Sequence, residues 1–214
     1  MGTRHLYLVR HGQSEPGGSA ADALGPGLTV LGWKQAHQTA RRLASLKVDV
    51  IHTSSLRRAM ETAQVLAVEH PDIPIRPAQL LWECVPFIPD FVLQWFKDHP
   101  DAEAIPAAIQ LWRAAWSGLD PLGNGLTGFE QAQQAWEKYF IPARGKDRID
   151  IVVCHGNLMR YFVVRSLQVA PEAWINIEIY NCAICEIVIE ANGRPRLISH
   201  NDSGHLKDDQ VTYH

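Results

Sequence analysis

The sequence lacks long apolar runs and an excess of basic residues. No stretch of about 18 uncharged apolar residues is present, and residues 1–9 carry Arg4 and lead into a strand pattern, unlike a signal peptide. The 20 Lys and Arg residues face 23 Asp and Glu residues, for a net charge of -3. A chain of this charge has no basic surplus to neutralise a polyanion, so we expect no binding to nucleic acid or to membranes.

Cysteine is also scarce, with 4 residues in 214. That number is too small for a disulfide scaffold and suits a reducing compartment, so we expect a cytoplasmic protein. Cys182 and Cys185 form a C-x-x-C pattern within residues 180–190, a run that reads as a strand. Residues three apart in a strand face opposite sides of the sheet, which favours a pair of core residues over a metal or redox site.

The length of 214 residues and the 46% hydrophobic content fit one domain, residues 1–214. Leu6–Val9 and 149–154 are mostly continuous apolar runs, typical of strands buried on both faces of a parallel sheet. Residues 175–189 and 196–200 indicate antiparallel edge strands. Thr29 and residues 53–55 are expected to cap the two helices that follow them. The pattern predicts an α/β fold: a three-layer sandwich of a mainly parallel sheet with helices on both faces.

Residues 84–146 contain no clear strand and are rich in tryptophan, so we expect a helical insertion over the active site. Trp112 and Trp116 are spaced to pack on one helical face, which favours a core role over ligand stacking. Acidic side chains outnumber basic ones in this insertion, so it offers no surplus of positive charge to an anionic ligand.

Polar clusters follow three of the expected strands. They are Arg10-His11-Gly12, Ser54 to Arg58, and His155-Gly156-Asn157. Ligands bind outside the carboxyl ends of strands in such sheets, so the clusters are expected to converge. Fixed guanidinium groups and helix ends suit a phosphate dianion, and a neutral imidazole can attack its phosphorus, which requires neither a metal nor a cofactor.

Several motifs in order along the chain carry a family resemblance. They are LVRHGQS at residues 8–14, Leu28-Thr29 with Gly32, Gln35 and Ala36, SSLRRA at 54–59 with Thr62-Ala63, LWE at 81–83, VVCHG at 152–156 and NDSGHL at 201–206. Together they resemble the histidine phosphatase superfamily, which has the phosphoglycerate-mutase-like fold.

The resemblance implies a covalent mechanism. His11 is expected to be the nucleophile that forms a phosphohistidine. Glu83 is expected to protonate the leaving oxygen and then to activate the hydrolytic water, a role that suits a carboxyl group whose pKa is raised by burial.

The resemblance also implies a phosphate clamp. Arg10, Arg58 and His155 are expected to hold the phosphate, with Asn157 adding a backbone N–H and Thr29 lining the pocket. As a group these side chains predict the catalytic and phosphate-binding site.

Within the superfamily, the likeness is strongest to the mitochondrial phosphoglycerate-mutase-like protein serine/threonine phosphatases. The segments that carry it are residues 81–89, 155–168 and 171–174. The targeting and membrane segment of those proteins has no counterpart in this sequence, so the mitochondrial address is not carried over and the cytoplasmic expectation stands.

The expected function is a metal-independent phosphatase acting on phosphomonoesters, with phosphoserine and phosphothreonine proteins as one substrate class. A phosphoglycerate mutase is the alternative within enzymes, and a non-catalytic phosphate-binding module is a further alternative. Retention of both His11 and Glu83 disfavours the module. The sequence leaves open the physiological substrate and homodimer formation through the edge strands or the insertion.

Overall fold

A six-stranded mixed sheet forms the centre of the molecule in the computed structural model, which describes residues 1–16, 24–86, 98 and 126–213. The strand order is β3-β2-β4-β1-β5-β6. The strands are β1 (Arg4–Arg10), β2 (Val50–Ser54), β3 (Ile75–Ala78), β4 (Arg148–Cys154), β5 (Ile184–Ile189) and β6 (Pro195–Asp202). The first four are parallel, whereas β5 and β6 are antiparallel, as the sequence predicted for the edge.

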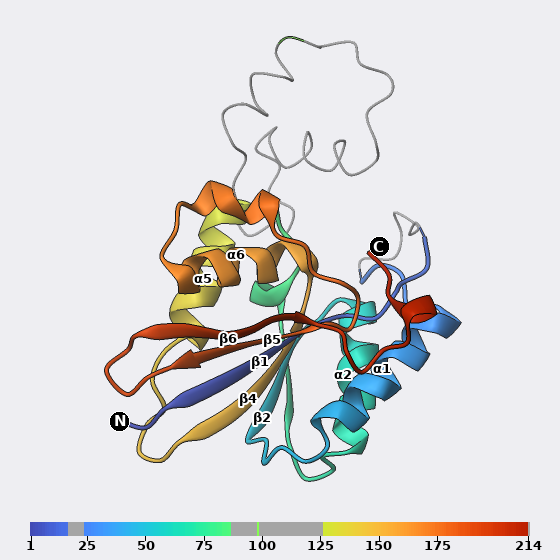
Figure 1. Cartoon of the computed structure of the whole chain (residues 1–214), viewed down its shortest axis with the longest axis horizontal. Coiled ribbons are helices and arrows are strands. Elements are labelled where there is room, and N and C mark those ends of the chain that lie inside the picture. Colours follow the sequence, from blue (N-terminus) through green and yellow to red (C-terminus); the bar gives the residue numbers. More distant parts are fainter. Residues whose placement is uncertain (17–23, 87–97, 99–125, 214) are drawn as a thin grey trace.

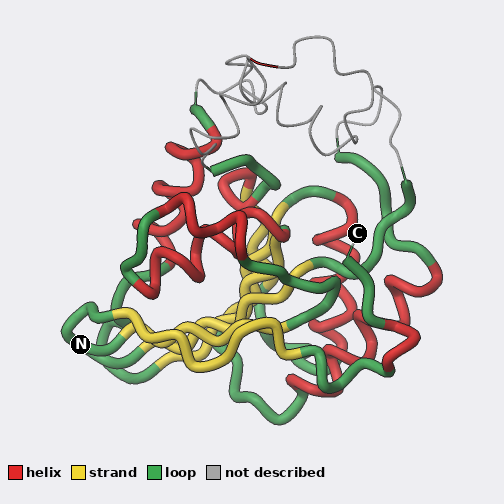
Figure 2. The backbone as a smooth tube through the Cα atoms, turned by 45° about the horizontal axis from the view of Figure 1, so that its top comes forward, coloured by secondary structure: helices red, strands yellow, loops and turns green. Residues whose placement is uncertain are grey.

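Helices cover both faces of this sheet (Figures 1 and 2). One face carries α1 (Val30–Leu43) and α2 (Arg57–Val68), and the other carries α5 (Gly128–Tyr139) and α6 (Gly156–Leu167). Short 3-10 helices are η1 (Gln79–Leu81), η2 (Pro171–Asn176) and η3 (Asp208–Gln210). The prediction of a three-layer α/β sandwich is confirmed.

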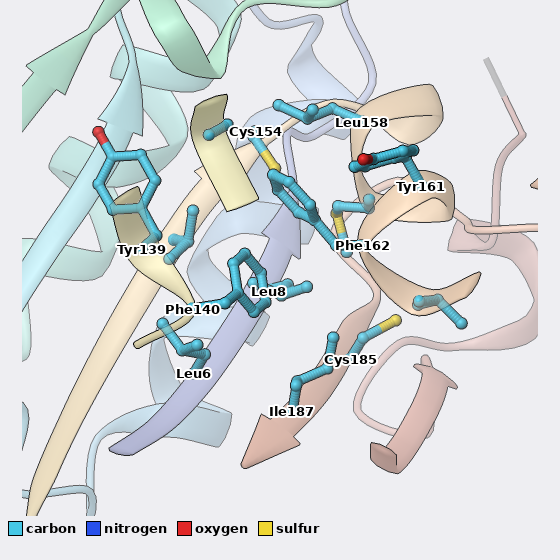
Figure 3. Close-up of a cluster of buried hydrophobic side chains, with 14 of the residues drawn as sticks. Leu6, Leu8, Tyr139, Phe140, Cys154, Leu158, Tyr161, Phe162, Cys185 and Ile187 are labelled. Carbon is cyan, nitrogen blue, oxygen red and sulfur yellow. The ribbon is translucent and has the colours of Figure 1, made fainter. Parts of the chain in front are cut away.

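The sheet separates two apolar cores because successive side chains of a strand point to opposite faces. Leu8 of β1 packs toward α5 and α6 with Phe140 and Phe162, as Figure 3 shows. Val9 packs on the other face, toward α1 and α2, with Ile151 of β4. The burial of β1 on both faces explains its continuous apolar run and fixes the residues that follow it.

Cys182 and Cys185 are divided between these two cores. Cys182 belongs to the cluster beside α1 and α2, and Cys185 to the cluster beside α5 and α6. Both are free and buried, which confirms the predicted core pair. The strand itself begins only at Ile184, because Cys182 adopts a left-handed conformation (φ 58°) in the turn that precedes it.

The first two helices begin in different ways. Thr29 caps α1 as expected, accepting a hydrogen bond from Gly32 N at 2.9 Å. The expected cap of α2 at residues 53–55 is wrong, because α2 begins at Arg57 after Leu56. Residues 53 and 54 instead complete β2, whose backbone pairs with β4.

Part of the expected insertion lies outside the described residues, including Trp112 and Trp116. Of the part that is described, α5 packs into the core through Ala132 and Ala135. No helix among the described residues is long and apolar enough to cross a membrane.

Candidate active site

Four of the predicted side chains meet at the carboxyl edge of β1, β2 and β4. Arg10 ends β1 and His11 follows it, while His155 follows β4 and stands at the N-cap of α6. Arg58 lies in the first turn of α2, shortly after β2. The three strands are neighbours and parallel, so their ends deliver these side chains to one place.

His11 is buried and held in one tautomer by its neighbours. Its Nδ1–H donates to the carbonyl of Gly12 at 2.8 Å, and its Nε2 accepts a hydrogen bond from Arg58 Nε at 3.1 Å. Burial, and then the positive charges of Arg58 and Arg10, hold the pKa of His11 well below its usual value. Nε2 therefore carries no proton at neutral pH, and its lone pair accepts the Arg58 hydrogen bond.

His155 is the second buried imidazole, and its ring centroid lies 5.0 Å from that of His11. Its Nε2 donates to Ser54 Oγ at 2.8 Å, while its Nδ1 accepts from Arg58 Nη2 at 3.2 Å. Burial and the nearby charge of Arg58 keep its pKa well below the usual value. One guanidinium thus bridges both histidines.

The guanidinium of Arg10 is held by hydrogen bonds at Nη1 and has no hydrogen-bond partner at Nε among the described residues. Its Nη1 donates to the carbonyls of Ile179 at 2.6 Å and Tyr213 at 2.9 Å. Its Nε is buried without a hydrogen-bond partner among the described residues. Within the same residues neither Arg10 nor Arg58 forms an ion pair, so two fixed cations remain for an anion.

Glu83 lies just beyond η1 and is half-buried. Its Oε1 accepts a hydrogen bond from Cys84 N at 3.3 Å. Burial raises the pKa of Glu83, although the positive charges of Arg58 and Arg10 act against this rise. A carboxyl group with a raised pKa beside the two arginines can hold a proton for a departing oxygen.

Thr29 and Asn157 use their side chains elsewhere. The Thr29 hydroxyl caps α1 and donates to Gln13 Oε1 at 2.8 Å. Asn157 Oδ1 accepts from Arg160 Nη1 at 3.2 Å. These contacts do not join the two side chains to the histidine and arginine cluster. The backbone N–H of Asn157, in the first turn of α6, remains a candidate phosphate ligand.

Helix α1 approaches residues 11–13, the expected catalytic segment, so closely that two glycines are required. A Cβ on Gly12 would lie 2.6 Å from the carbonyl oxygen of Gly32. A Cβ on Gly32 would lie 2.0 Å from the carbonyl oxygen of Gln13. Both distances are shorter than real side chains allow, so the glycines let α1 pack directly against the segment that follows His11.

Sequence reasoning assigned no role in the site to three supporting residues: Ser54, Gln35 and Asn181. The last two are fully buried amides, and Asn181 Nδ2 donates to the carbonyl of His11 at 3.1 Å. The available signal for Gln35 was a polar side chain on the buried face of an amphipathic helix. In the part of the chain that the structure describes, no group of three or more His, Cys, Asp or Glu residues is placed to hold a metal ion.

Curated relatives resemble almost the whole chain. Serine/threonine-protein phosphatase PGAM5, mitochondrial, of Homo sapiens is 33% identical over 98% of this chain, and the protein of that name from Caenorhabditis elegans is 30% identical over 99%. The chain spans 66% of the length of the human relative. The expected likeness to phosphoglycerate-mutase-like protein phosphatases is confirmed.

The same relatives contradict the expected cytoplasmic location. Each of them is named as a mitochondrial protein, which points to mitochondria rather than to the cytoplasm. The inference from cysteine content was wrong because a low cysteine count fits any reducing compartment and does not single out the cytoplasm.

Solved structures share the fold. A phosphoglycerate mutase from Plasmodium falciparum has a TM-score of 0.60 and 27% identity, with all of both chains covered. A phosphoserine phosphatase from Entamoeba histolytica has a TM-score of 0.62 with 21% identity, covering 95% of this chain and all of its own.

The family model called histidine phosphatase superfamily (branch 1) matches residues 6–203. The match begins in β1, ahead of His11, and ends beyond β6, so it includes every residue of the site. The phosphatase activity expected from the motifs agrees with this match and with the names of the relatives. The chain belongs to the histidine phosphatase superfamily.

Proposed function

We propose that this protein is a phosphatase that hydrolyses phosphomonoesters through a phosphohistidine on His11, and that its substrates are phosphoserine and phosphothreonine proteins. The observation that carries the proposal is Nε2 of His11, which accepts a hydrogen bond from Arg58 and so carries no proton, beside Arg10 and Arg58, two half-buried arginines without ion pairs among the described residues. Positioned cations and a neutral imidazole are the parts that phosphoryl transfer to histidine needs.

In the first step, Nε2 of His11 attacks phosphorus and the bond to the ester oxygen breaks. The proton held by Glu83 passes to that oxygen, so the leaving group departs as an alcohol. Arg10 and Arg58 surround the equatorial oxygens and stabilise their charge, and His155 holds the Arg58 guanidinium in place through its Nδ1. The raised pKa of Glu83 keeps the carboxyl group protonated for this step.

In the second step, the Glu83 carboxylate takes a proton from water and the water oxygen attacks phosphorus. The phosphorus–nitrogen bond then breaks, inorganic phosphate leaves, and both the neutral imidazole and the protonated carboxyl group are restored. The lowered pKa of His11 favours this return to the neutral ring.

Arg58 has to change partners during this cycle. Its Nε–H donates to Nε2 of His11, the atom that must attack phosphorus. We expect the guanidinium to transfer this hydrogen bond to a phosphate oxygen when substrate binds. Such a transfer frees the lone pair only when an anion is present.

The substrate class follows from the relatives, whose names specify serine/threonine-protein phosphatases. A phosphoglycerate mutase is the second candidate, since one structural neighbour with 27% identity bears that name. A mutase would pass the phosphoryl group from His11 to a second sugar-acid hydroxyl instead of to water. The acidic balance of residues 84–143 disfavours a doubly charged substrate.

The test is inorganic phosphate release from phosphoserine peptides, phosphothreonine peptides, sugar phosphates and 3-phosphoglycerate. We expect the peptides to be preferred and His11→Ala to reduce kcat by about three orders of magnitude or more. Enzyme quenched in alkali should carry a phosphoryl group on His11 that is stable in base and is lost in acid. His37→Ala is the matched control, because His37 is exposed on α1.

Three results would redirect the proposal. Interconversion of phosphoglycerates without net phosphate release would establish the mutase, and phosphate binding without turnover would establish a binding module. Activity that EDTA abolishes and added divalent metal restores would overturn the metal-independent mechanism.

A further inference from the structure

Gln35 is a fully buried side chain to which the proposed mechanism gives no role. It lies on the face of α1 that packs against the catalytic segment, where its neighbours are small or apolar. A buried amide is costly unless its donors and acceptor are all used. The hydrogen bonds of Gln35 therefore indicate its role.

The acceptor of Gln35 contacts the peptide group between Gly12 and Gln13. Gln35 Oε1 accepts a hydrogen bond from Gln13 N at 2.8 Å. The carbonyl of the same peptide group, Gly12 O, accepts the Nδ1–H of His11 at 2.8 Å. Because a peptide group is planar, holding its N–H also fixes the direction of its carbonyl.

The donor of Gln35 holds the opposite side. Its Nε2 donates to the carbonyl of Gln210 at 2.6 Å and to Thr212 Oγ1 at 2.9 Å. A carbonyl can only accept and a backbone N–H can only donate, so these neighbours leave one orientation for the amide. Gln35 thus points its oxygen at the catalytic peptide group.

We propose that Gln35 is a positioning residue that sets the tautomer of His11 through the Gly12–Gln13 peptide group. The amide keeps Gly12 O aimed at Nδ1, which retains the proton there and leaves the Nε2 lone pair for phosphorus. Hydrogen bonds in series polarise one another, so the Gln35 contact also strengthens the acceptor that Nδ1 faces. The inference rests on the proposed function, because His11 is the nucleophile in that function alone.

Helix α1 offers a matched control. Gln38 Nε2 donates to Gln210 Oε1 at 2.6 Å, so it contacts the segment of residues 207–213 as Gln35 does. This contact does not reach the Gly12–Gln13 peptide group. A role that consists only of holding residues 207–213 would be shared by both glutamines, whereas tautomer control belongs to Gln35.

The experiment compares Gln35→Met, Gln35→Glu and Gln38→Met in the full chain. We expect Gln35→Met to lower kcat by about tenfold or more with KM nearly unchanged, because Arg10 and Arg58 still bind phosphate. A protonated Glu is isosteric with Gln and keeps the acceptor, so Gln35→Glu should recover most of the lost kcat. Gln38→Met should change kcat by less than about twofold.

The second readout is independent of turnover. Nitrogen-15 NMR of the His11 ring should place the proton on Nδ1 in the wild type and in Gln38→Met, and on both nitrogens in exchange in Gln35→Met. Signals are assigned by their loss in His11→Ala.

Two outcomes would overturn the inference: a wild-type ring protonated on Nε2, or a folded Gln35→Met with unchanged tautomer and kcat. If Gln35→Met does not fold, a wild-type ring protonated on Nε2 would still overturn the inference. A protein without turnover but with the Nδ1 tautomer would refute the proposed function and leave the positioning role intact.

Discussion

Within the described ranges, charged side chains are paired with one another at one end of strands β1 and β4 and not at the other. At the amino end, buried Asp150 pairs with Arg148 Nε at 2.6 Å and Arg4 Nη1 at 3.5 Å, and His52 Nε2 lies 3.8 Å away. At the carboxyl end, Arg10 has no such partner among the described residues. The charges of the first cluster are paired within the chain, whereas the charge of Arg10 remains for an anion.

The pKa values of the carboxyl groups at the two ends are shifted in opposite directions. Burial acts to raise the pKa of Asp150, but the neighbouring His52, Arg148 and Arg4 outweigh it and the pKa is lowered. Burial of Glu83 outweighs its two arginines, so its pKa is raised. The difference distinguishes a structural carboxylate from a group suited to proton transfer.

The largest expected effect is on turnover at the carboxyl end. Arg58→Ala should reduce kcat/KM by about 100- to 1,000-fold, because the bridging guanidinium is lost from both histidines and from the phosphate. The melting temperature should change by no more than about 2 °C, since no ion pair is broken. Arg57→Ala, at the exposed neighbouring position, should keep wild-type kcat/KM. Equal losses in both variants would contradict the assignment.

Glu83→Gln tests the proton donor. The variant should lose about 100-fold in kcat with alkyl phosphates, whose leaving oxygen needs a proton, and much less with p-nitrophenyl phosphate. The measurement is the dependence of kcat on the pKa of the leaving alcohol. A uniform loss across the series would show that Glu83 is not chiefly the leaving-group acid.

Asp150→Asn should affect stability and not catalysis. Removing the carboxylate leaves Arg4 and Arg148 without their partner, so we expect the free energy of unfolding to fall by about 2 to 3 kcal/mol. Urea unfolding measures this change. The kcat of the folded variant should remain within about twofold of wild type. A large loss of kcat would mean that the two ends of the sheet are coupled.

The smallest effect is a pH dependence that separates the two ends. The pKa of His155 is lowered on folding, so below about pH 6.5 the unfolded chain binds a proton there that the folded chain does not. Its stabilisation is therefore full above that pH and is lost as pH falls. We expect His155→Asn to reduce the slope between pH 6.5 and 5 by up to about 1.4 kcal/mol per pH unit.

The same measurement should give a different result for Asp150→Asn. Asp150, with its lowered pKa, stays ionised across this range, so Asp150→Asn should leave the slope between pH 6.5 and 5 unchanged. Urea midpoints at several pH values provide both slopes. Identical slopes for His155→Asn and wild type would indicate that His155 is already charged in the folded protein.

The sequence predicted the parts of the site that depend on strand ends. Arg10, His11 and His155 follow buried apolar runs, and parallel strands bring such positions together whatever the details of packing. Only the family motif identified Arg58, and not Arg57, as the site residue. In the structure Arg57 is exposed to solvent.

The remaining features depend on contacts between distant residues. Gln35 reaches Gln210 and Thr212, and Asn181 reaches His11, so no local pattern reveals these contacts. The start of α2 was misplaced because local capping preferences favoured serine and threonine positions that pairing with β4 keeps in the strand.

The central position of β1 also has a consequence for synthesis of the chain. Arg4 pairs with Arg148 of β4 on one edge and with Ile189 of β5 on the other. This strand, which precedes His11, leaves the ribosome before β4 and β5, which follow only after β2 and β3 have been made. Until then the backbone N–H and C=O groups on both edges of β1 are open to wrong pairing, so this strand is where we expect chaperone dependence to originate.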